Sequence, residues 1–227
     1  MTAAERIANQ FNCDEPILVE DIIRMFPDRS RQWVDKALKT MVDSRALKRY
    51  STGVYYIPRK TMFGDSLLDS DRVVTKKYIE SNGKVYGYVS GTALLNSLGL
   101  TTQVPNMIII VTNKESSRGR KVKIGKQEVY LIKSPTEITK ENCAVLQLLE
   151  AVKAVNLNDL DETELNNLEK YIKNNEITIK DVSKYCVFFP DVVSKKILGG
   201  KLIEKLHDNQ TLFHDILLAV RDDGIAV

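Results

Sequence analysis

Cationic side chains gather between residues 28 and 60. Nine Lys and Arg residues stand there against three Asp residues, a net charge of +6, whereas the whole chain carries only +3. Ammonium and guanidinium groups bind phosphates. Their concentration on one segment is typical of nucleic-acid-binding proteins, because neutralised phosphates release counterions. The nine residues are Arg29, Arg31, Lys36, Lys39, Arg45, Lys48, Arg49, Arg59 and Lys60.

The helix expected inside this stretch, over residues 31–42, does not by itself indicate nucleic-acid binding. A capped amphipathic helix with a charged outer face is usually only a solvated helix. The basic hairpin that follows it, with strands at 47–50 and 54–57 around a turn at 51–53, changes the interpretation. A basic helix followed at once by a basic hairpin is the layout of a winged helix-turn-helix. There the helix enters the major groove of DNA and the hairpin lies along the backbone.

Each residue of this predicted DNA-binding site is assigned a role by its position. The beginning of the helix would lie deepest in the groove, so base edges are expected to be read by Arg31, Gln32 and Lys36. Phosphate contacts are expected from Arg29, Lys39, Lys48, Arg49 and Arg59. Ser30, which is expected to cap the helix, and Thr52, in the hairpin turn, complete the set.

Motifs for covalent or metal-assisted catalysis are incomplete. The run Gly87-Tyr88-Val89-Ser90-Gly91 has Tyr where a nucleophile elbow needs Gly, two residues before the Ser. We expect Ser90 to cap a helix instead. His207 and His214, the two histidines, have no Cys or Glu pair at ligand spacing, so no metal site is expected.

Phosphate loops and acidic metal clusters are not evident either. Gly199-Gly200-Lys201 has no Gly at P-loop spacing before it. The acidic pairs at 159/161 and 222/223 do not amount to the cluster that two catalytic metal ions require. The sequence therefore predicts a protein that is not an enzyme and uses no cofactor. A nucleic-acid enzyme whose acids meet only in the fold remains a third hypothesis.

Composition and charge distribution suggest a divided molecule. Of the 227 residues, 43% are apolar and 28% charged, as in ordinary globular proteins. Basic and acidic residues number 11 and 8 over residues 1–60, 12 and 7 over 61–140, and 10 and 15 over 141–227. The front of the chain is thus basic and the rear acidic, which suggests different tasks.

Cysteine usage and hydropathy favour the cytoplasm. Cys13, Cys143 and Cys186 are odd in number and far apart, as expected of free thiols in a reducing compartment. The first ten residues form a polar helix start without the apolar core of a secretory signal. No apolar run approaches the ~20 residues of a membrane span. We expect a cytoplasmic protein with no membrane partner.

The remaining elements predict an α+β protein in three parts. Residues 1–62 form the N-terminal winged helix-turn-helix, with a helix at 2–11, a strand at 17–19 and a helix at 20–26 before the basic helix. Residues 63–135 form a central small α/β domain, and residues 136–227 a mostly helical C-terminal region. A linker is expected at 59–65, and a helix at about 67–81 that Asn82-Gly83 ends as a C-cap.

The central domain and the C-terminal region each show clear patterns. Strands are expected at 85–89 and 107–111, a helix at 93–98, and a hairpin of 121–124 and 128–132 with a type II′ turn at Gly125-Lys126. Helices are expected at 142–155 and 162–174, with a capping box at Thr178 and Asp181, and from Pro190-Asp191 to about residue 206. The apolar segment 212–220 fits either a helix or an edge strand.

A second group of cations surrounds the predicted hairpin of the central domain. One interpretation is a solvated sheet edge that lysines protect against aggregation. The other is a second phosphate-contacting surface, or a docking face for an acidic partner. The group consists of Lys114, Arg118, Arg120, Lys121, Lys123 and Lys126.

Two stretches resemble a known family. They are Gly53-Val54-Tyr55-Tyr56-Ile57-Pro58, and Ser90-Gly91-Thr92-Ala93-Leu94-Leu95-Asn96-Ser97-Leu98-Gly99-Leu100-Thr101-Thr102-Gln103-Val104-Pro105, which an apolar strand and the basic strand 121–124 follow. Together they resemble the AbiEi family of antitoxins from type IV toxin–antitoxin systems, which act in phage defence. The resemblance covers roughly residues 1–135, and Leu-Gly-Leu-Thr-Thr-Gln-Val-Pro is its most specific part.

This resemblance implies a two-part protein. Its winged helix would bind double-stranded DNA at inverted repeats in the promoter of its own operon and repress transcription. The remainder would counteract a nucleotidyltransferase-like toxin, and in this type of system the two proteins need not form a stable complex. The alternative is a protein-interaction module with a winged helix that does not bind DNA.

Overall fold

The structure, a computed structural model, describes residues 2–199 of this mixed α+β chain. Its residues fall into two compact units. The N-terminal unit comprises the described residues up to Gly83 together with Lys121–Val129. The C-terminal unit comprises Lys84–Arg120 and the described residues from Tyr130 onward. Within the described range, no helix combines the length and apolar character that crossing a bilayer requires.

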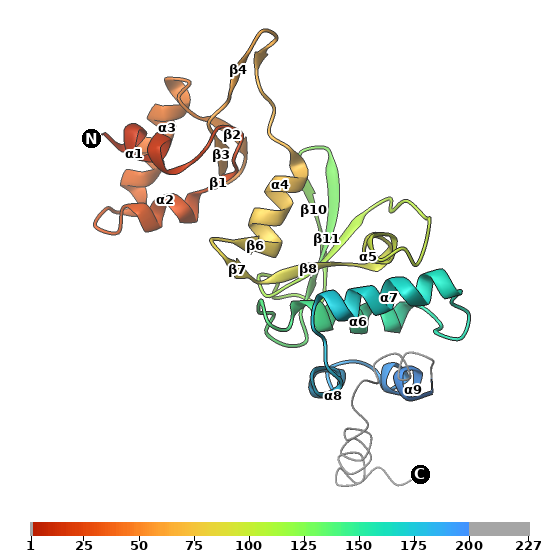
Figure 1. The fold of residues 1–227 in the computed structure, drawn as a ribbon. Coiled ribbons are helices and arrows are strands. Elements are labelled where there is room, and N and C mark those ends of the chain that lie inside the picture. Colours follow the sequence, from red (N-terminus) through yellow and green to blue (C-terminus); the bar gives the residue numbers. More distant parts are fainter. Residues whose placement is uncertain (1, 200–227) are drawn as a thin grey trace. The chain divides into compact units, whose positions relative to one another are not determined.

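The N-terminal unit begins with three helices and a three-stranded antiparallel sheet (Figure 1). The sheet order is β1-β3-β2, in which Ile17 pairs with Tyr55 and Lys48 with Tyr56. The three helices and three strands predicted in this part of the chain are confirmed, with ends within one residue. Their bounds are α1 Ala3–Gln10, β1 Ile17–Leu18, α2 Val19–Met25, α3 Arg31–Asp43, β2 Lys48–Ser51 and β3 Val54–Tyr56.

Helix α3 owes its position to its cap and its apolar stripe. The Ser30 hydroxyl accepts a hydrogen bond from the backbone N–H of Trp33 at 3.2 Å, as the sequence predicts. Val34, Leu38 and Met41 are buried at helical spacing. They join a core to which α1, β1 and α2 also contribute. The opposite face of α3 is thereby left in water.

Residues 59–65, expected to be a linker, form a second hairpin instead. Its strands are β4 Lys60–Thr61 and β5 Gly64–Asp65, paired antiparallel with Lys60 opposite Asp65. Gly64 has a φ of 105°, a value that side chains with a Cβ rarely adopt, so glycine allows the chain to reverse here. The hairpin projects from the N-terminal unit in Figure 1.

The prediction of a single helix at 67–81 is also wrong. Helix α4, Ser70–Val74, continues as the π-helical segment η1, Thr75–Ile79, and the chain then becomes extended. Asn82 and Gly83 both have positive φ, 53° and 73°, and connect β6 Glu80–Ser81 to β7 Lys84–Val85. Asn-Gly is a strong signal for a two-residue hairpin turn as well as for a helix end, and here the turn prevails.

A four-stranded sheet of order β10-β11-β9-β8 follows, with α5, Gly91–Ser97, after its first strand in the chain. Gly87 of β8 pairs with Thr112 of β9 in an antiparallel register. The predicted turn at Gly125-Lys126 connects β10 to β11, and Gly125 has a positive φ of 61°, as a type II′ turn requires at that position. The strands are β8 Gly87–Ser90, β9 Ile108–Thr112, β10 Arg120–Ile124 and β11 Gln127–Lys133.

Helices complete the C-terminal unit. They share an apolar core with β8 and β9, to which Tyr88, Val111 and Leu149 contribute. The capping box of Thr178 and Asp181 is confirmed. The expected end of the last helix near 206, the segment 212–220, His207, His214 and the acidic pair 222/223 lie outside the described residues. The helices are α6 Cys143–Ala154, α7 Glu162–Asn174, α8 Ile179–Cys186 and α9 Asp191–Gly199.

Candidate nucleic-acid interface

The outward face of α3 carries a polar stripe. Gln32, Lys36 and Lys39 follow one another at intervals of four and three residues, so they lie on one side of the helix, opposite the buried stripe. All three side chains are exposed. No described residue forms an ion pair with Lys36 or Lys39. The two ammonium groups are therefore available to an anionic partner.

The two arginines at the start of α3 already have intramolecular partners. Arg31 lies 3.1 Å from the Asp35 carboxylate, and both side chains are more than half exposed. The Arg29 guanidinium lies over the Trp33 ring, 5.2 Å from its centroid. An exposed ion pair of this kind contributes only about 0–1 kcal/mol, so an anionic ligand can replace Asp35 at little cost.

The hairpin of β2 and β3 carries the rest of the predicted site. Arg49 and Thr52 are exposed, and no described residue forms an ion pair with Arg49. Lys48 is partly buried and lies 3.1 Å from Asp65. Arg59, just after β3, lies 3.5 Å from Asp14. The structure thus places all ten predicted residues in the N-terminal unit and leaves nine of them exposed.

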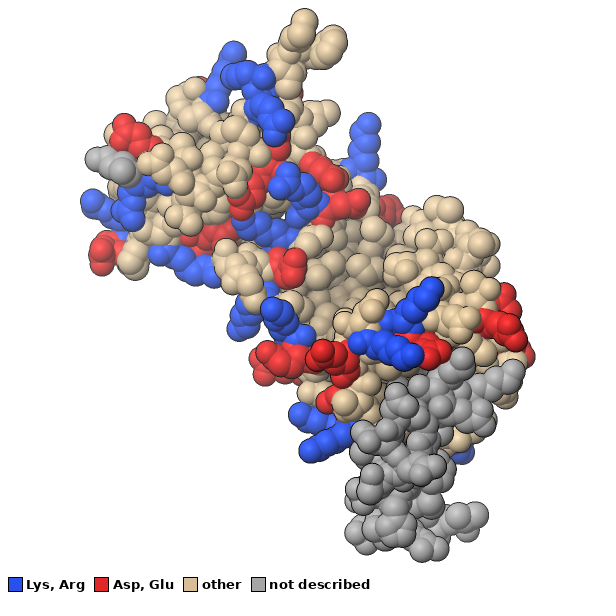
Figure 2. All heavy atoms as spheres, in the orientation of Figure 1, with Lys and Arg blue, Asp and Glu red and all other residues tan. Residues whose placement is uncertain are grey.

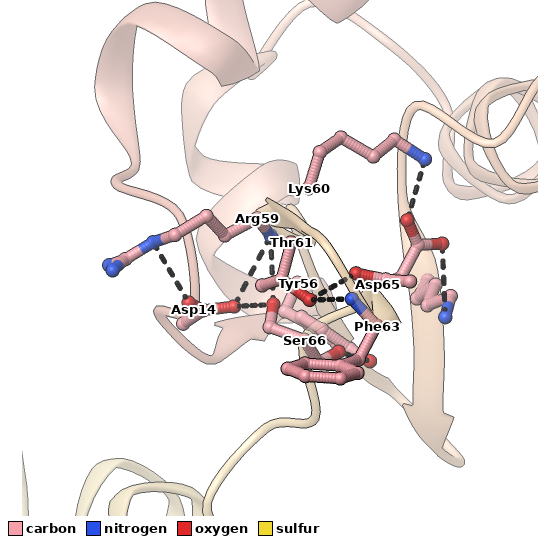
Figure 3. Close-up of polar contacts among 10 residues, drawn as sticks. Asp14, Tyr56, Arg59, Lys60, Thr61, Phe63, Asp65 and Ser66 are labelled. Carbon is pink, nitrogen blue, oxygen red and sulfur yellow. Dashed lines mark hydrogen bonds and ion pairs between the residues drawn. The ribbon is translucent and has the colours of Figure 1, made fainter.

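Two carboxylates that sequence reasoning missed hold part of this site. Asp65 lies between Lys48 and Lys60. Hydrogen bonds from their ammonium groups lower the pKa of the Asp65 carboxyl, and the bond from Lys60 has the larger effect. Asp14 lies beside Arg59 and Ser66 (Figure 3). No spacing in the sequence joins Asp14 to Arg59, because 45 residues separate them.

The second basic group is divided between the two units. Arg118 and Arg120 belong to the C-terminal unit, where Arg120 lies 2.6 Å from the buried Glu115. Lys121, Lys123 and Lys126 belong to the N-terminal unit and are exposed.

The turn of β10 and β11 packs closely within the N-terminal unit. A Cβ added to Gly125 would overlap the hydroxyl of Tyr50 on β2. That hydroxyl is hydrogen-bonded to Ser70 at 2.8 Å, and Gln127 donates to Asp71 at 2.9 Å. Three lysines that lie 65 to 70 residues beyond the end of β3 are therefore carried by the same unit as α3, which no local sequence pattern indicates.

A comparison with known families matches residues 9–180 of the chain to DUF6088, a family of unknown function. The match covers well over half of the 227 residues. The chain belongs to the DUF6088 family. A comparison with curated proteins gave no match.

The part of the chain matched to DUF6088 contains the whole predicted site. It begins within α1 and ends within α8. It therefore includes α3, the β2–β3 hairpin, the β4–β5 hairpin and the turn at Gly125. The family carries no assigned activity, so the function of this surface has to be argued from its own residues.

The other residues considered for chemistry have different roles. Ser90 occupies the N-cap position of α5, as predicted, but its side chain makes no capping hydrogen bond. Its hydroxyl donates instead to Glu150 at 3.3 Å, beside a pocket of about 270 Å³. Asp161 caps α7. In the described part of the chain, no group of three His, Cys, Asp or Glu residues is arranged to hold a metal ion.

Proposed function

We propose that the N-terminal unit contains a winged helix that binds double-stranded DNA, and that the chain regulates the transcription of its own operon. The observation that carries this proposal is the exposed polar stripe of α3 next to a basic hairpin. Lys36, Lys39 and Arg49 stand there without ion-pair partners among the described residues. The element order helix, strand, helix, helix, hairpin supports it, because such domains are built in that order.

The proposed binding mode divides the contacts by type. Helix α3 enters the major groove, where the Gln32 amide is suited to pair with adenine and Arg31, once released from Asp35, with guanine. Lys39 and Arg49 contact phosphates on either side, which fixes register and supplies affinity without sequence information. Lys121, Lys123 and Lys126 add positive charge to the same unit. The proposal includes no catalytic step and no cofactor.

The antitoxin part of the proposal depends on the resemblance to the AbiEi family. Its most specific stretch, residues 98–105, follows α5 as a loop. The Asn96 amide holds this loop by donating to the carbonyls of Thr101 and Gln103, at 3.3 and 3.2 Å. We propose that the chain counteracts a nucleotidyltransferase-like toxin, with or without direct contact.

A reporter assay in cells tests the regulatory role. The DNA upstream of the gene for this chain is fused to a reporter, and the full chain is supplied from a second plasmid. Repression by the wild type, lost when Lys36, Lys39 and Arg49 are all replaced by Ala, is the expected result. Equal reporter output with and without the chain contradicts autoregulation. Coexpression with the product of a neighbouring nucleotidyltransferase-like gene tests the antitoxin role through cell survival.

A protein-interaction module that does not bind DNA is the second candidate. Exposed apolar side chains at the end of α8 and on α9 favour it, since Val187 is 75% exposed and Val192 and Leu198 about half exposed. Sequence-specific retardation of upstream DNA by the purified chain excludes this candidate. Absence of retardation together with capture of the toxin supports it.

A further inference from the structure

The turn between β4 and β5 presents two apolar side chains to water. Met62 is 98% exposed and Phe63 is 101% exposed, so neither side chain is covered by the fold. The tip of this projecting hairpin is uncharged in Figure 2, and Lys and Arg side chains lie nearer its base. Exposing a Phe and a Met costs solvation free energy, which is regained when a partner covers them.

Hydrogen bonds organise the turn itself. The Thr61 hydroxyl donates to the Gly64 carbonyl at 2.7 Å and accepts from the backbone N–H of Phe63 at 3.3 Å. Each strand of the hairpin has only two residues, so these bonds replace the longer ladder that would otherwise fix the turn. The two apolar side chains are held at the end of an ordered turn.

The base of the hairpin is fixed by a second network (Figure 3). Ser66 accepts at its hydroxyl from the Arg59 backbone N–H at 2.8 Å and donates its own backbone N–H to the Arg59 carbonyl at 2.9 Å. The Tyr56 hydroxyl donates to the Ser66 carbonyl at 3.0 Å, and the Ser66 hydroxyl donates to Asp14. The arm is therefore preorganised, which lowers the entropy lost on binding.

Cations cover the carboxylates at this base. The side chains of Lys60 and Arg59 are 73% and 68% exposed, and that of Lys48 is 41% exposed. The carboxylates they contact, Asp65 and Asp14, are only 18% and 19% exposed. The surface offered to a partner is thus positive around the base and apolar at the tip.

A DNA minor groove offers the complementary surface, with phosphates along its walls and stacked bases between them. Architectural proteins insert Phe or Met between base steps in this groove and kink the duplex. Strand β3 runs from the turn at Thr52 and Gly53 to Tyr56, and the chain then continues into β4. The arm therefore leaves the sheet at the end opposite the first turn, and a major groove is flanked by a minor groove on each side.

We propose that the β4–β5 hairpin is a DNA-inserting arm. Met62 and Phe63 enter a minor groove next to the major groove that α3 occupies and wedge between base pairs there. Arg59 and Lys60 contact the adjacent phosphates. This inference rests on the proposed DNA binding and adds to it a kinked duplex and a second zone of contact.

The test uses the full chain and a double variant, Met62→Ser with Phe63→Ser. The matched control is Val104→Ser, which removes an apolar side chain that is 84% exposed in the C-terminal unit. Thermal unfolding of each variant establishes that the fold is retained. Fluorescence anisotropy measures affinity for a duplex taken from upstream of the gene, and energy transfer between dyes at its two ends measures bending.

The wild type and Val104→Ser are expected to bind with equal affinity and to shorten the end-to-end distance of the duplex. The double variant is expected to bind about tenfold or more weakly and to leave the duplex straight. Equal affinity and equal bending by the double variant overturn the arm while DNA binding by α3 stands. Failure of the wild type to bind any duplex overturns both proposals.

The competing explanation for the apolar tip is that a second copy of the chain covers it. Light scattering of the wild type and the double variant without DNA measures self-association. An unchanged oligomeric state in the double variant supports the arm when bending is lost. Dissociation of a wild-type oligomer by the two substitutions, with DNA bending unchanged, overturns the proposal.

Discussion

Cations in the proposed interface differ in what they must give up to bind DNA. Lys36, Lys39 and Arg49 are exposed and form no ion pair with the described residues, so they lose only water when they meet DNA. Arg31 first has to leave Asp35. Each neutralised phosphate releases counterions, so the three unpaired cations are expected to dominate the salt dependence of binding.

Arg49→Ala is expected to weaken binding to every duplex alike and to reduce the slope of log affinity against log salt by about one unit. The reason is that a phosphate contact carries no sequence information. Anisotropy titrations at several salt concentrations, with upstream DNA and a scrambled duplex, measure this. A loss that is the same at every salt concentration contradicts the phosphate role.

Gln32→Ala is expected to act differently, by relaxing sequence preference. An amide paired with adenine contributes about 1–3 kcal/mol of discrimination, and alanine removes it while the charge of the surface stays the same. Binding to a set of duplexes with single substitutions measures the change at one base position. An unaltered preference at all positions places the Gln32 side chain outside the groove.

Glu115 makes the stability of the C-terminal unit depend on pH. Its carboxylate accepts from the backbone N–H and hydroxyl of Ser117 and from Arg120 at 2.6 Å. These contacts lower the pKa of Glu115 from 4.5 to about 2, and the hydrogen bond from the Ser117 backbone N–H has the largest effect. Because the folded pKa lies below the unfolded one, Glu115 stabilises the fold above about pH 4.5, and this contribution is lost as the pH falls towards 2.

Glu115→Gln is therefore expected to lower the free energy of unfolding at pH 7 by about 1–3 kcal/mol. The difference from the wild type should shrink steadily between pH 4.5 and pH 2. Urea unfolding followed by circular dichroism at several pH values measures it. An equal difference at pH 7 and near pH 2 shows that the charge of Glu115 is not responsible.

Among the elements, the turn of β10 and β11 has a role beyond its own hairpin. It packs against Tyr50 of β2, and the Tyr50 hydroxyl is bonded to Ser70 at the start of α4. Gly125 is required there for two reasons, its positive φ of 61° and the lack of space for a Cβ. The turn therefore keeps three basic residues of the second group within the N-terminal unit.

Gly125→Ala is expected to destabilise the fold by about 1–3 kcal/mol, since backbone strain adds to an overlap with Tyr50. Gly83→Ala is the matched control, because Gly83 has a φ of 73° but open space around its Cβ position. Urea unfolding of both variants separates the two effects. A loss no greater than that of Gly83→Ala shows that Tyr50 moves away without cost.

Local signals in the sequence predicted most elements, and non-local partners account for the errors. The Ser30 cap, the stripe of α3 and the capping box at Thr178 are decided by residues within one turn of a helix. No local spacing predicts the hairpin at 60–65, because its base is held by Asp14, far away in the sequence. Ser90 occupies the N-cap position of α5 as predicted, but its hydroxyl donates to Glu150, 60 residues away, and makes no capping bond.

Most of the candidate site can be predicted from the local composition of the sequence. A concentration of Lys and Arg on one helix and hairpin is visible in the sequence, and nine of the ten predicted residues are exposed. Which cations are already paired was not predictable, because Asp14 and Asp65 face Arg59 and Lys48 only in the fold. The exposure of Met62 and Phe63 likewise depends on the β4–β5 hairpin, where the sequence predicts a linker.

On the scale of the whole molecule, the excess positive charge lies in the N-terminal unit. The matched family span includes the complete N-terminal unit apart from its first residues and ends within α8. Basic and acidic residues of the sequence number 17 and 13 in the N-terminal unit and 16 and 17 in the rest of the chain. This asymmetry fits a DNA-binding front and a rear with another partner, as the antitoxin proposal requires.

The salt dependence of DNA binding tests the central claim most directly. Purified full chain is titrated against upstream duplex DNA between low and moderate salt, beside a triple variant with Lys36, Lys39 and Arg49 replaced by Ala. A charge-matched control replaces Lys170, Lys180 and Lys195, exposed lysines of the C-terminal unit, by Ala. The account predicts that the triple variant lowers the slope of log affinity against log salt by about two to three units, whereas the control leaves it unchanged. Equal slopes for all three proteins, or no binding by the wild type at low salt, would contradict it.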